Sequence, residues 1–178
     1  MGALAKLPIF LDLDAKRAVV AGGTAAAAWK AELLAAAGAR VEIFAAHLTD
    51  EMSSLIERGA ADGSITHVGS HWTPAVMSGA AIALADAEDE QEAASFAEAA
   101  RDAGVQCNVI DKPAYCQFQF GSIVNRSPVV IGISTDGAAP ILGQAIRRRI
   151  ETLLPPAIAD WGRLAKAVRR IVSDKLPN

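Results

Sequence analysis

The sequence predicts an α/β fold, in which a doubly wound parallel sheet is followed by a small region of strands and helices. Two observations lead to this class. Through residues 1–113, short apolar segments typical of strands alternate with alanine-rich segments typical of helices, as parallel strands joined by helical crossovers require. Beyond residue 113 the alternation stops, and two strand-like segments precede two helix-like segments. Because such crossovers are right-handed, an open doubly wound sheet is the leading topology.

The first elements form one strand–helix–strand unit. We expect a strand over residues 15–21 that ends at the glycine pair 22–23, and then a helix over 25–37, which is filled with strong helix formers. Gly38 follows that helix, where a glycine adopts positive φ without steric cost. A second strand is expected over residues 40–45, which completes a segment of the size of one βαβ unit.

The same alternation continues and then changes. Thr49 is placed to cap a helix that runs to about Arg58. The remaining elements that we expect are strands over 64–68, 79–85, 105–110, 118–126 and 128–134 and helices over 89–103, 140–153 and 157–172. The last two strands and two helices bury too little to form a core alone. They therefore pack on the first region or are completed by a second copy of the chain, and we favour dimerisation.

Composition excludes several classes of protein. Of 178 residues, 52% are apolar and 21% are charged, which excludes a disordered chain. The net charge of −3 argues against affinity of the whole protein for nucleic acid. Apolar runs are far shorter than the roughly 20 residues of a membrane helix, and residues 1–6 lack a signal-peptide core. The two cysteines match neither a disulfide framework nor a zinc pattern, so we expect a cytoplasmic protein with reduced thiols.

Charge divides the chain unevenly. Residues 1–120 contain 8 Lys/Arg against 16 Asp/Glu, whereas residues 121–178 contain 9 against 4. This asymmetry predicts that the basic C-terminal third has a role of its own. The alternative is that arginines on exposed helix faces keep the protein soluble.

The first glycine turn is a candidate anion site, because N–H groups at a helix N-terminus bind phosphate. The dinucleotide fingerprint G-x-G-x-x-G/A falls on Gly22, Thr24 and Ala27, so its middle position does not match. Glu42 lies 20 residues beyond Gly22, near the spacing of a ribose ligand, but at mid-strand, where a solvent-facing or edge role is favoured. The turn alone leaves open a flavodoxin-like or other α/β domain that binds no dinucleotide.

Several short stretches form a more specific pattern. They are Leu7-Pro8-Ile9-Phe10, the glycine pair 22–23 with Ala27 and Lys30, Cys107-Asn108-Val109-Ile110-Asp111-Lys112-Pro113, Gly121-Ser122-Ile123-Val124-Asn125-Arg126-Ser127-Pro128, and Ile133-Ser134-Thr135-Asp136-Gly137-Ala138-Ala139-Pro140. In this order, and over essentially its whole length, the chain resembles the precorrin-2 dehydrogenase/sirohydrochlorin ferrochelatase module of siroheme synthase. The motifs C-N-V-x-D-x-P and S-I-V-x-R-S-P are much more specific than the glycine turn.

The resemblance implies a Rossmann-like dinucleotide-binding domain over residues 1–113, dimerisation strands over 114–140 and a shortened helical region over 141–178. It implies a homodimer that oxidises precorrin-2 to sirohydrochlorin with NAD⁺ as hydride acceptor. In the bifunctional members, Fe²⁺ is then inserted as a substrate to give siroheme. Because members of the family usually continue with more helices, the resemblance supports the dehydrogenase more strongly than the chelatase.

The resemblance also implies roles for particular residues. NAD⁺ is expected on Gly22, Gly23, Thr24, Ala25, Ala26, Ala46, His47 and Asn108. Asp111 ends a strand at the carboxyl edge of the sheet and is the candidate general base; without its surrounding motif it would be assigned to capping the next turn. Asn108 either bonds the cofactor or orients a neighbouring loop. Cys107 is expected to be a small buried hydrophobe.

The substrate is expected in the basic C-terminal third, because precorrin-2 carries many carboxylates. The residues expected to bind it are Ser134, Thr135, Gly137 and Arg126, with further attraction from Arg147-Arg148-Arg149. Asp136 stands where the family commonly has glycine. The alternative for this turn is a helix cap made by Thr135 or Asp136.

No resident metal is expected. Gly69-Ser70, in an expected loop, separates His67 from His71, so this pair lacks helical geometry, and with His47 the two are interpreted as surface histidines. Two alternatives stand beside the leading interpretation. One is a tetrapyrrole- or nucleotide-binding module that has lost its chemistry, and the other is a chelatase that uses Asp111 without a dinucleotide. The sequence distinguishes neither NAD from NADP nor iron from cobalt.

Overall fold

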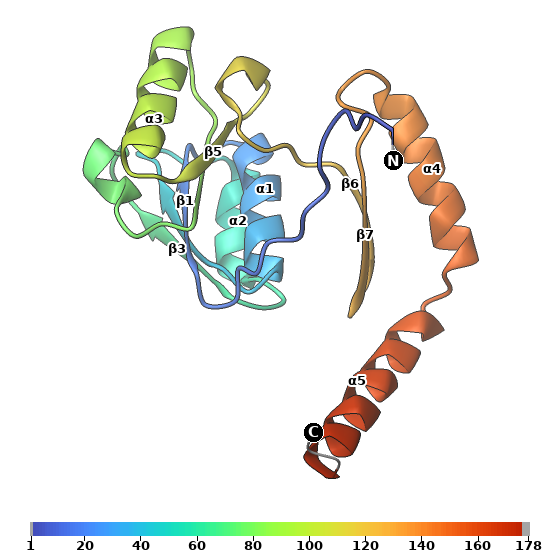
Figure 1. The fold of residues 1–178 in the computed structure, drawn as a ribbon. Coiled ribbons are helices and arrows are strands. Elements are labelled where there is room, and N and C mark those ends of the chain that lie inside the picture. The colour runs from blue at the N-terminus through green and yellow to red at the C-terminus, as the bar shows by residue number, and fades with distance from the viewer. Residues whose placement is uncertain (1, 176–178) are drawn as a thin grey trace. The chain divides into compact units, whose positions relative to one another are not determined.

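A computed structural model describes residues 2–175, which form two compact units (Figure 1). One unit spans Phe10–Gln119, and the other combines the residues up to Ile9 with the chain from Phe120 onward. The first unit contains every element of the alternating region. The second contains the two later strands and the two later helices.

The first unit is built on a five-stranded parallel sheet with the strand order β3-β2-β1-β4-β5. Its strands are β1 (Arg17–Ala21), β2 (Arg40–Phe44), β3 (Ser64–Val68), β4 (Ile82–Ala85) and β5 (Gln106–Val109). The chain runs outward from β1 to β3 and returns to β4 on the other side of β1, so the order reverses between β1 and β4. Open α/β sheets bind ligands at such a switch point. The predicted Rossmann-like, doubly wound sheet is confirmed.

Helices cover both faces of this sheet. Helices α1 (Ala25–Ala36) and α2 (Asp50–Arg58) lie side by side on one face, and α3 (Glu90–Asp102) lies on the other (Figure 1). Side-chain caps account for the starts of α1, α2 and α3, and Thr24 caps the first of these. Thr49 Oγ1 accepts a hydrogen bond from Met52 N at 3.5 Å, and Asp89 Oδ1 accepts one from Glu92 N at 2.8 Å.

The core of the first unit is aliphatic, as the low aromatic content predicts. Val19, Ile43 and Leu84 are fully buried on the central strands. Phe96 of α3 is also buried, and the Trp72 ring meets it edge-on with the ring centroids 5.0 Å apart. Because helices cover both faces of the sheet, the central strands are apolar on both sides rather than alternating.

The second unit contains an antiparallel pair, β6 (Ser122–Arg126) and β7 (Val129–Ile133), with α4 (Pro140–Leu153) packed on β6 and α5 (Ala157–Lys175) in contact with β7. Within its described residues, Val124 and Gly143 are the two that are fully buried. Its large exposed apolar residues include Ile141, Leu142, Leu153, Trp161, Leu164, Val168, Ile171 and Val172. The unit therefore has little core of its own.

Some elements differ from the expectation. β4 begins only at Ile82, because Ala80 N donates to Met77 O at 3.1 Å and closes a turn after the short helix η1 (Pro74–Met77). Helix α4 begins with Pro140 in its first turn, after Ala139 as N-cap, and has no side-chain cap. The alternative in which Thr135 or Asp136 caps this helix is therefore wrong. No helix in residues 2–175 combines the length and the hydropathy that a membrane crossing requires.

Candidate cofactor-binding and catalytic site

The turn between β1 and α1 requires glycine at both positions of its glycine pair. Gly22 has φ of 112°, and a Cβ there would lie 3.2 Å from Asp86 Cβ. A Cβ on Gly23 would lie 2.1 Å from the His47 carbonyl oxygen, a backbone atom with no freedom to move away. Without side chains at these two positions, the turn packs closely against Asp86 and against the loop that contains His47. The turn lies at the carboxyl edge of the sheet, at the switch point.

Thr24 takes the position where the fingerprint has its second glycine, and its side chain caps α1. Its Oγ1 accepts a hydrogen bond from Ala27 N at 3.1 Å, and its hydroxyl donates to Asp86 Oδ2. The N–H of Ala27 is thereby occupied. The N–H groups of Ala25 and Ala26, at the start of the helix, have no partner within it, so they are the donors that suit a phosphate.

The two segments predicted to hold the cofactor meet at this edge. Thr49 N donates to Gly23 O at 2.8 Å, which draws the loop after β2 against the glycine turn. Ala46 and His47, in that loop, are exposed. The structure therefore brings residues 22–26 together with Ala46 and His47.

Glu42 does not take part in this edge. Its Oε2 accepts hydrogen bonds from Arg17 Nε at 3.0 Å and from Arg17 Nη2 at 2.7 Å. The bond from Arg17 lowers the pKa of the Glu42 carboxyl. Since Arg17 is the first residue of β1, Glu42 is tied to the opposite end of that strand from the glycine turn, in an ion pair rather than at a ribose.

Asp111 lies two residues beyond the end of β5, where its carboxylate is exposed. Ile110 N donates to Ala85 O at 2.8 Å and extends the strand pairing up to the turn. The turn is closed by Lys112 N, which donates to Val109 O at 3.1 Å, and Asp111 itself has φ of 57°. The carboxylate is therefore at the carboxyl end of the sheet and available to a ligand, as the general-base assignment requires.

Lys30 of α1 belongs to the electrostatic surroundings of Asp111. Burial lowers the pKa of Lys30, and the negative charge of Asp111 opposes that lowering. The Lys30 ammonium also lies over the Trp29 ring, 4.2 Å from the ring centroid.

Cys107 and Asn108 are successive residues of β5, so their side chains point to opposite faces of the sheet. Asn108 is 8% exposed, and its Nδ2 donates to Phe118 O at 2.9 Å and to Cys116 Sγ at 3.2 Å. Its amide therefore orients the loop that follows, which was one of the two roles expected for it. Cys107 is fully buried, as predicted, and burial raises the pKa of its thiol to about 11.

The residues predicted to bind substrate in the second unit fall at two separate places. Ser134, Thr135 and Gly137 lie in the turn after β7, where Ser134 Oγ accepts from Asp136 N at 3.1 Å. Arg126 lies at the opposite end of the β6–β7 pair, since it pairs with Val129 while Ser122 pairs with Ile133. Its Nε donates to Leu154 O at 2.9 Å. The structure therefore does not gather these four residues into one site.

The histidines are dispersed. His47 and His71 are exposed, as expected, whereas His67 lies in β3, is half-buried and has its Nε2 2.8 Å from Ala45 O. In residues 2–175 no group of three or more His, Cys, Asp or Glu side chains is arranged to hold a metal ion.

Comparison with known proteins gives this geometry a family. A family model described as putative NAD(P)-binding matches residues 9–122. The chain belongs to this NAD(P)-binding family. Membership favours a dinucleotide at the glycine turn over the alternative of an α/β domain without one.

Longer relatives of the NAD(P)-binding chain are siroheme synthases. That of Thiobacillus denitrificans is 39% identical over 164 residues, which cover 92% of this chain and 33% of the relative. That of Pseudomonas aeruginosa strain PAO1 is 36% identical over 172 residues, which cover 97% of this chain and 36% of the relative. The chain thus spans about a third of the length of these relatives.

A solved structure has the same fold. "SirC, precorrin-2 dehydrogenase" is similar with a TM-score of 0.81, and the similarity covers 97% of this chain and 83% of that one. At 16% sequence identity this similarity shows the fold alone.

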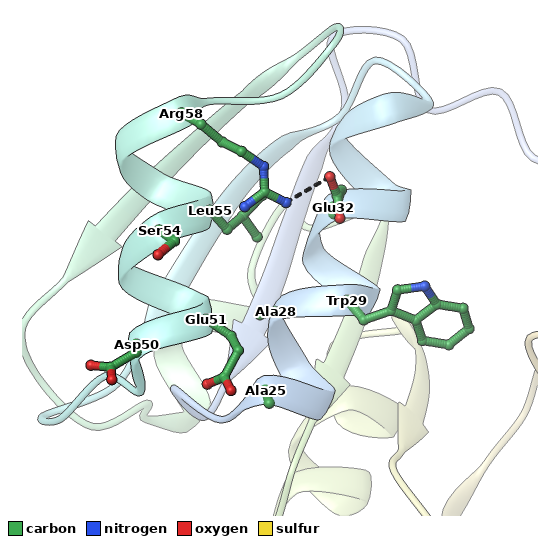
Figure 2. Close-up of a pocket in the computed structure, with 9 residues that line it drawn as sticks. All are labelled: Ala25, Ala28, Trp29, Glu32, Asp50, Glu51, Ser54, Leu55 and Arg58. Carbon is green, nitrogen blue, oxygen red and sulfur yellow. Dashed lines mark hydrogen bonds and ion pairs between the residues drawn. The ribbon is translucent and has the colours of Figure 1, made fainter.

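A groove of about 460 Å³ lies between α1 and α2 of the NAD(P)-binding unit (Figure 2). The apolar residues of its lining are Ala25, Ala28, Trp29 and Leu55, and the ion pair between Glu32 and Arg58 spans it at 2.8 Å. Figure 2 shows the Trp29 ring directed away from α2. Of the predicted site residues, the groove includes Ala25 alone, so it is separate from the proposed catalytic carboxylate.

Two polar residues of the NAD(P)-binding unit were missed as site residues by sequence reasoning. Asp86 directly follows β4 and joins the glycine turn through Thr24. An acidic residue after an apolar strand is a visible signal, but its neighbour could not be named before the strand order was known. Lys30 stands within a stretch of the resemblance, and its relation to Asp111 depends on how α1 packs.

Proposed function

We propose that this chain oxidises precorrin-2 to sirohydrochlorin with NAD⁺ as hydride acceptor. The observation that carries the proposal is the exposed carboxylate of Asp111 at the carboxyl edge of the sheet, the same edge at which the glycine turn after β1 lies. Its siroheme synthase relatives and its fold, shared with a protein titled precorrin-2 dehydrogenase, support the choice of substrate.

The reaction removes one hydride and one proton from the macrocycle, so it needs an acceptor for each. Bound NAD⁺ supplies the hydride acceptor. The N–H groups of Ala25 and Ala26 hold its pyrophosphate, and the glycine pair admits it to the switch point. Asp111 accepts the proton that leaves as the substrate is oxidised, which a carboxylate does when it reaches the reacting carbon.

Recognition of the substrate follows from charge. Precorrin-2 is polyanionic, and residues 121–178 carry 9 Lys/Arg against 4 Asp/Glu. The turn with Ser134, Thr135 and Gly137 offers hydroxyl and N–H donors for carboxylates, and Arg126 provides charge at the other end of the strand pair. Asp136 of this turn forms an ion pair with Lys6 at 3.3 Å, which offsets its negative charge.

A homodimer completes the second unit. We assign dimerisation to residues 114–140, together with the apolar sides of α4 and α5 in the helical region 141–178, because the exposed apolar side chains of these two helices need a cover that the described residues of this unit do not provide. A second copy of the same chain covers these apolar side chains. The cytoplasmic location stays a prediction from the sequence.

Ferrous iron insertion is the second candidate activity, favoured by relatives that are named siroheme synthases. In this step Fe²⁺ is a substrate, and Asp111 would receive protons released from the macrocycle nitrogens. The measurement is anaerobic formation of siroheme from sirohydrochlorin and Fe²⁺, compared with the reaction without protein. An equal rate in both contradicts chelatase activity.

The test of the dehydrogenase combines binding with turnover. NAD⁺ titration should saturate, and anaerobic precorrin-2 should convert to sirohydrochlorin with NAD⁺ or with NADP⁺, which also decides between the two cofactors. Asp111→Asn, which keeps size and removes the base, should lower kcat by about 100-fold or more while NAD⁺ binding is retained. Asp102→Asn, an exposed aspartate at the end of α3, is the matched control and should keep full activity.

The outcomes separate the alternatives. Absence of saturable NAD⁺ binding rules out the dehydrogenase, and binding without turnover supports the module that has lost its chemistry. An unchanged rate in Asp111→Asn would remove the catalytic assignment of Asp111 even if the wild-type protein is active.

A further inference from the structure

The turn that carries Asp111 is held by a thiol. Cys116 Sγ lies 3.2 Å from the Val109 carbonyl oxygen and 3.4 Å from the Lys112 carbonyl oxygen, within reach of its S–H for donation to either. These two carbonyl groups stand on either side of Asp111 in the chain. The sulfur therefore ties together both ends of the short turn from which the carboxylate projects.

Cys116 is in turn fixed by a buried amide. Asn108 Nδ2 donates to Cys116 Sγ at 3.2 Å and to Phe118 O at 2.9 Å. Because Asn108 lies on β5 and is 8% exposed, it connects the loop to the rigid sheet. Cys116 is half-buried in this arrangement. Position 116 therefore requires a small side chain that both donates a hydrogen bond and accepts one, and the thiol of Cys116 does both.

The Asp111 turn needs such support because of its backbone. Asp111 adopts φ of 57°, a left-handed conformation that costs a residue other than glycine roughly 1 kcal/mol or more. Strained residues keep such a conformation only where the surroundings determine it. The main-chain bonds nearby close turns between Val109 and Cys116, but the thiol is the side chain that contacts the carbonyls on both sides of Asp111.

We propose that Cys116 is a positioning residue for Asp111, whose thiol clamps the strained turn and so aims the carboxylate at the substrate. The inference rests on the proposed function, in which Asp111 receives a proton. Cys116 touches no reacting atom in this scheme. Its effect passes through the carbonyl groups of Val109 and Lys112 alone.

The electrostatics of Lys30 agree with a compact cluster. The negative charge of Asp111 raises the pKa of Lys30 and so opposes the lowering by burial. This effect agrees with the sulfur–carbonyl contacts, which place Cys116 beside the turn that carries Asp111.

The kinetic test compares Cys116→Ala with Cys116→Ser in the full chain. Alanine removes the donor, whereas serine keeps one, although on a shorter bond. Cys116→Ala should lower kcat for precorrin-2 oxidation by about 10-fold to 100-fold, because a misplaced base loses its alignment with the substrate. The KM for precorrin-2 and the NAD⁺ dissociation constant should stay within about twofold of wild type. Cys116→Ser should recover most of the lost kcat.

Cys107→Ala is the matched control. Its thiol is also on this part of the chain, but it faces the core and contacts Tyr115 O at 3.4 Å rather than a carbonyl beside Asp111. We expect a lower melting temperature and an unchanged kcat. An equal fall of kcat in Cys107→Ala and Cys116→Ala would overturn the proposal, since general loosening of the loop would then explain both.

A measurement without turnover separates this inference from the proposed function. Hydrogen exchange at the amides of Lys112, Tyr115 and Cys116 should be faster in Cys116→Ala by about 10-fold or more and close to wild type in Cys116→Ser. If the wild-type protein shows no oxidation, the proposed function fails while faster exchange still supports the clamp. Unchanged exchange in Cys116→Ala overturns the clamp, and faster exchange with an unchanged kcat overturns its positioning role.

Discussion

At the residue scale, Thr24 has two roles at the entrance of the proposed cofactor site. Its Oγ1 caps α1 through Ala27 N, and its hydroxyl donates to Asp86, which belongs to a different strand end. A glycine at this position would admit a phosphate more closely but would give up both bonds. Thr24 therefore stabilises the turn through two hydrogen bonds, whereas the glycine of the fingerprint would leave more room for a phosphate.

Thr24→Ala is predicted to lower the free energy of unfolding by about 1–2 kcal/mol, because it removes the cap and leaves the Asp86 carboxylate without its donor. Urea denaturation followed by circular dichroism measures this change. Thr24→Ser should stay close to wild type. Thr49→Ala is the matched control, with a smaller loss, since the Thr49 cap bond is longer at 3.5 Å. Equal losses in the two alanine variants would contradict a stabilising role for the bond to Asp86.

At the element scale, α5 is an amphipathic helix without a covered apolar side. Trp161, Leu164 and Val168 follow one another at helical spacing and are each about half exposed or more. Arg163 and Lys166 occupy other sides of the helix. A helix of this kind is stable when its apolar side is covered, which is the reason for assigning a second copy of the chain to it.

Val168→Asp is predicted to shift the homodimer toward monomer, because it places a charge within the apolar side of α5. Light scattering after size-exclusion chromatography, at several concentrations, measures the molar mass. Ser173→Asp introduces the same charge five positions further along α5, on the polar side of the helix, and should leave the mass unchanged. A monomeric wild-type protein, or equal behaviour of both variants, would refute this interface.

At the scale of the whole molecule, charge separates the chain into an acidic N-terminal part and a basic C-terminal part. The difference suits the proposed polyacidic substrate, since the basic part attracts carboxylates while the acidic part does not. Exposed Arg148 and Arg149 of α4 contribute to that attraction. Arg147 contributes less, because it is paired with Glu151 at 3.0 Å.

The KM for precorrin-2 is predicted to rise severalfold between low and high salt, because exposed charges are screened beyond about 10 Å at 0.1 M salt. Initial rates at fixed NAD⁺ and increasing potassium chloride measure it. The double variant Arg148→Gln/Arg149→Gln should raise the KM at low salt and flatten its dependence on salt. A KM that is independent of salt in the wild-type protein would show that long-range charge does not recruit the substrate.

The sequence was sufficient wherever the deciding interaction is local. Thr49 and Asp89 cap their helices through bonds to residues three positions away, and Pro140 begins α4 within its own turn. Because the two partners of such a cap are only a few residues apart, the sequence alone predicts where these helices start. The position of Asp111 after β5 followed in the same way, since a strand end is visible as the end of an apolar run.

Tertiary structure decided what depends on residues far apart in the chain. Thr24 and Asp86 are 62 positions apart, and they meet because β1 and β4 are neighbours in the sheet. The separation of Arg126 from the turn with Ser134 follows from the register of an antiparallel pair. The sequence by itself thus determined the elements and the residue types at their ends, because backbone preferences and caps act over a few residues. The partner of each polar side chain was decided only when the strands were ordered and the helices packed, because burial forces those groups to find donors and acceptors across the fold.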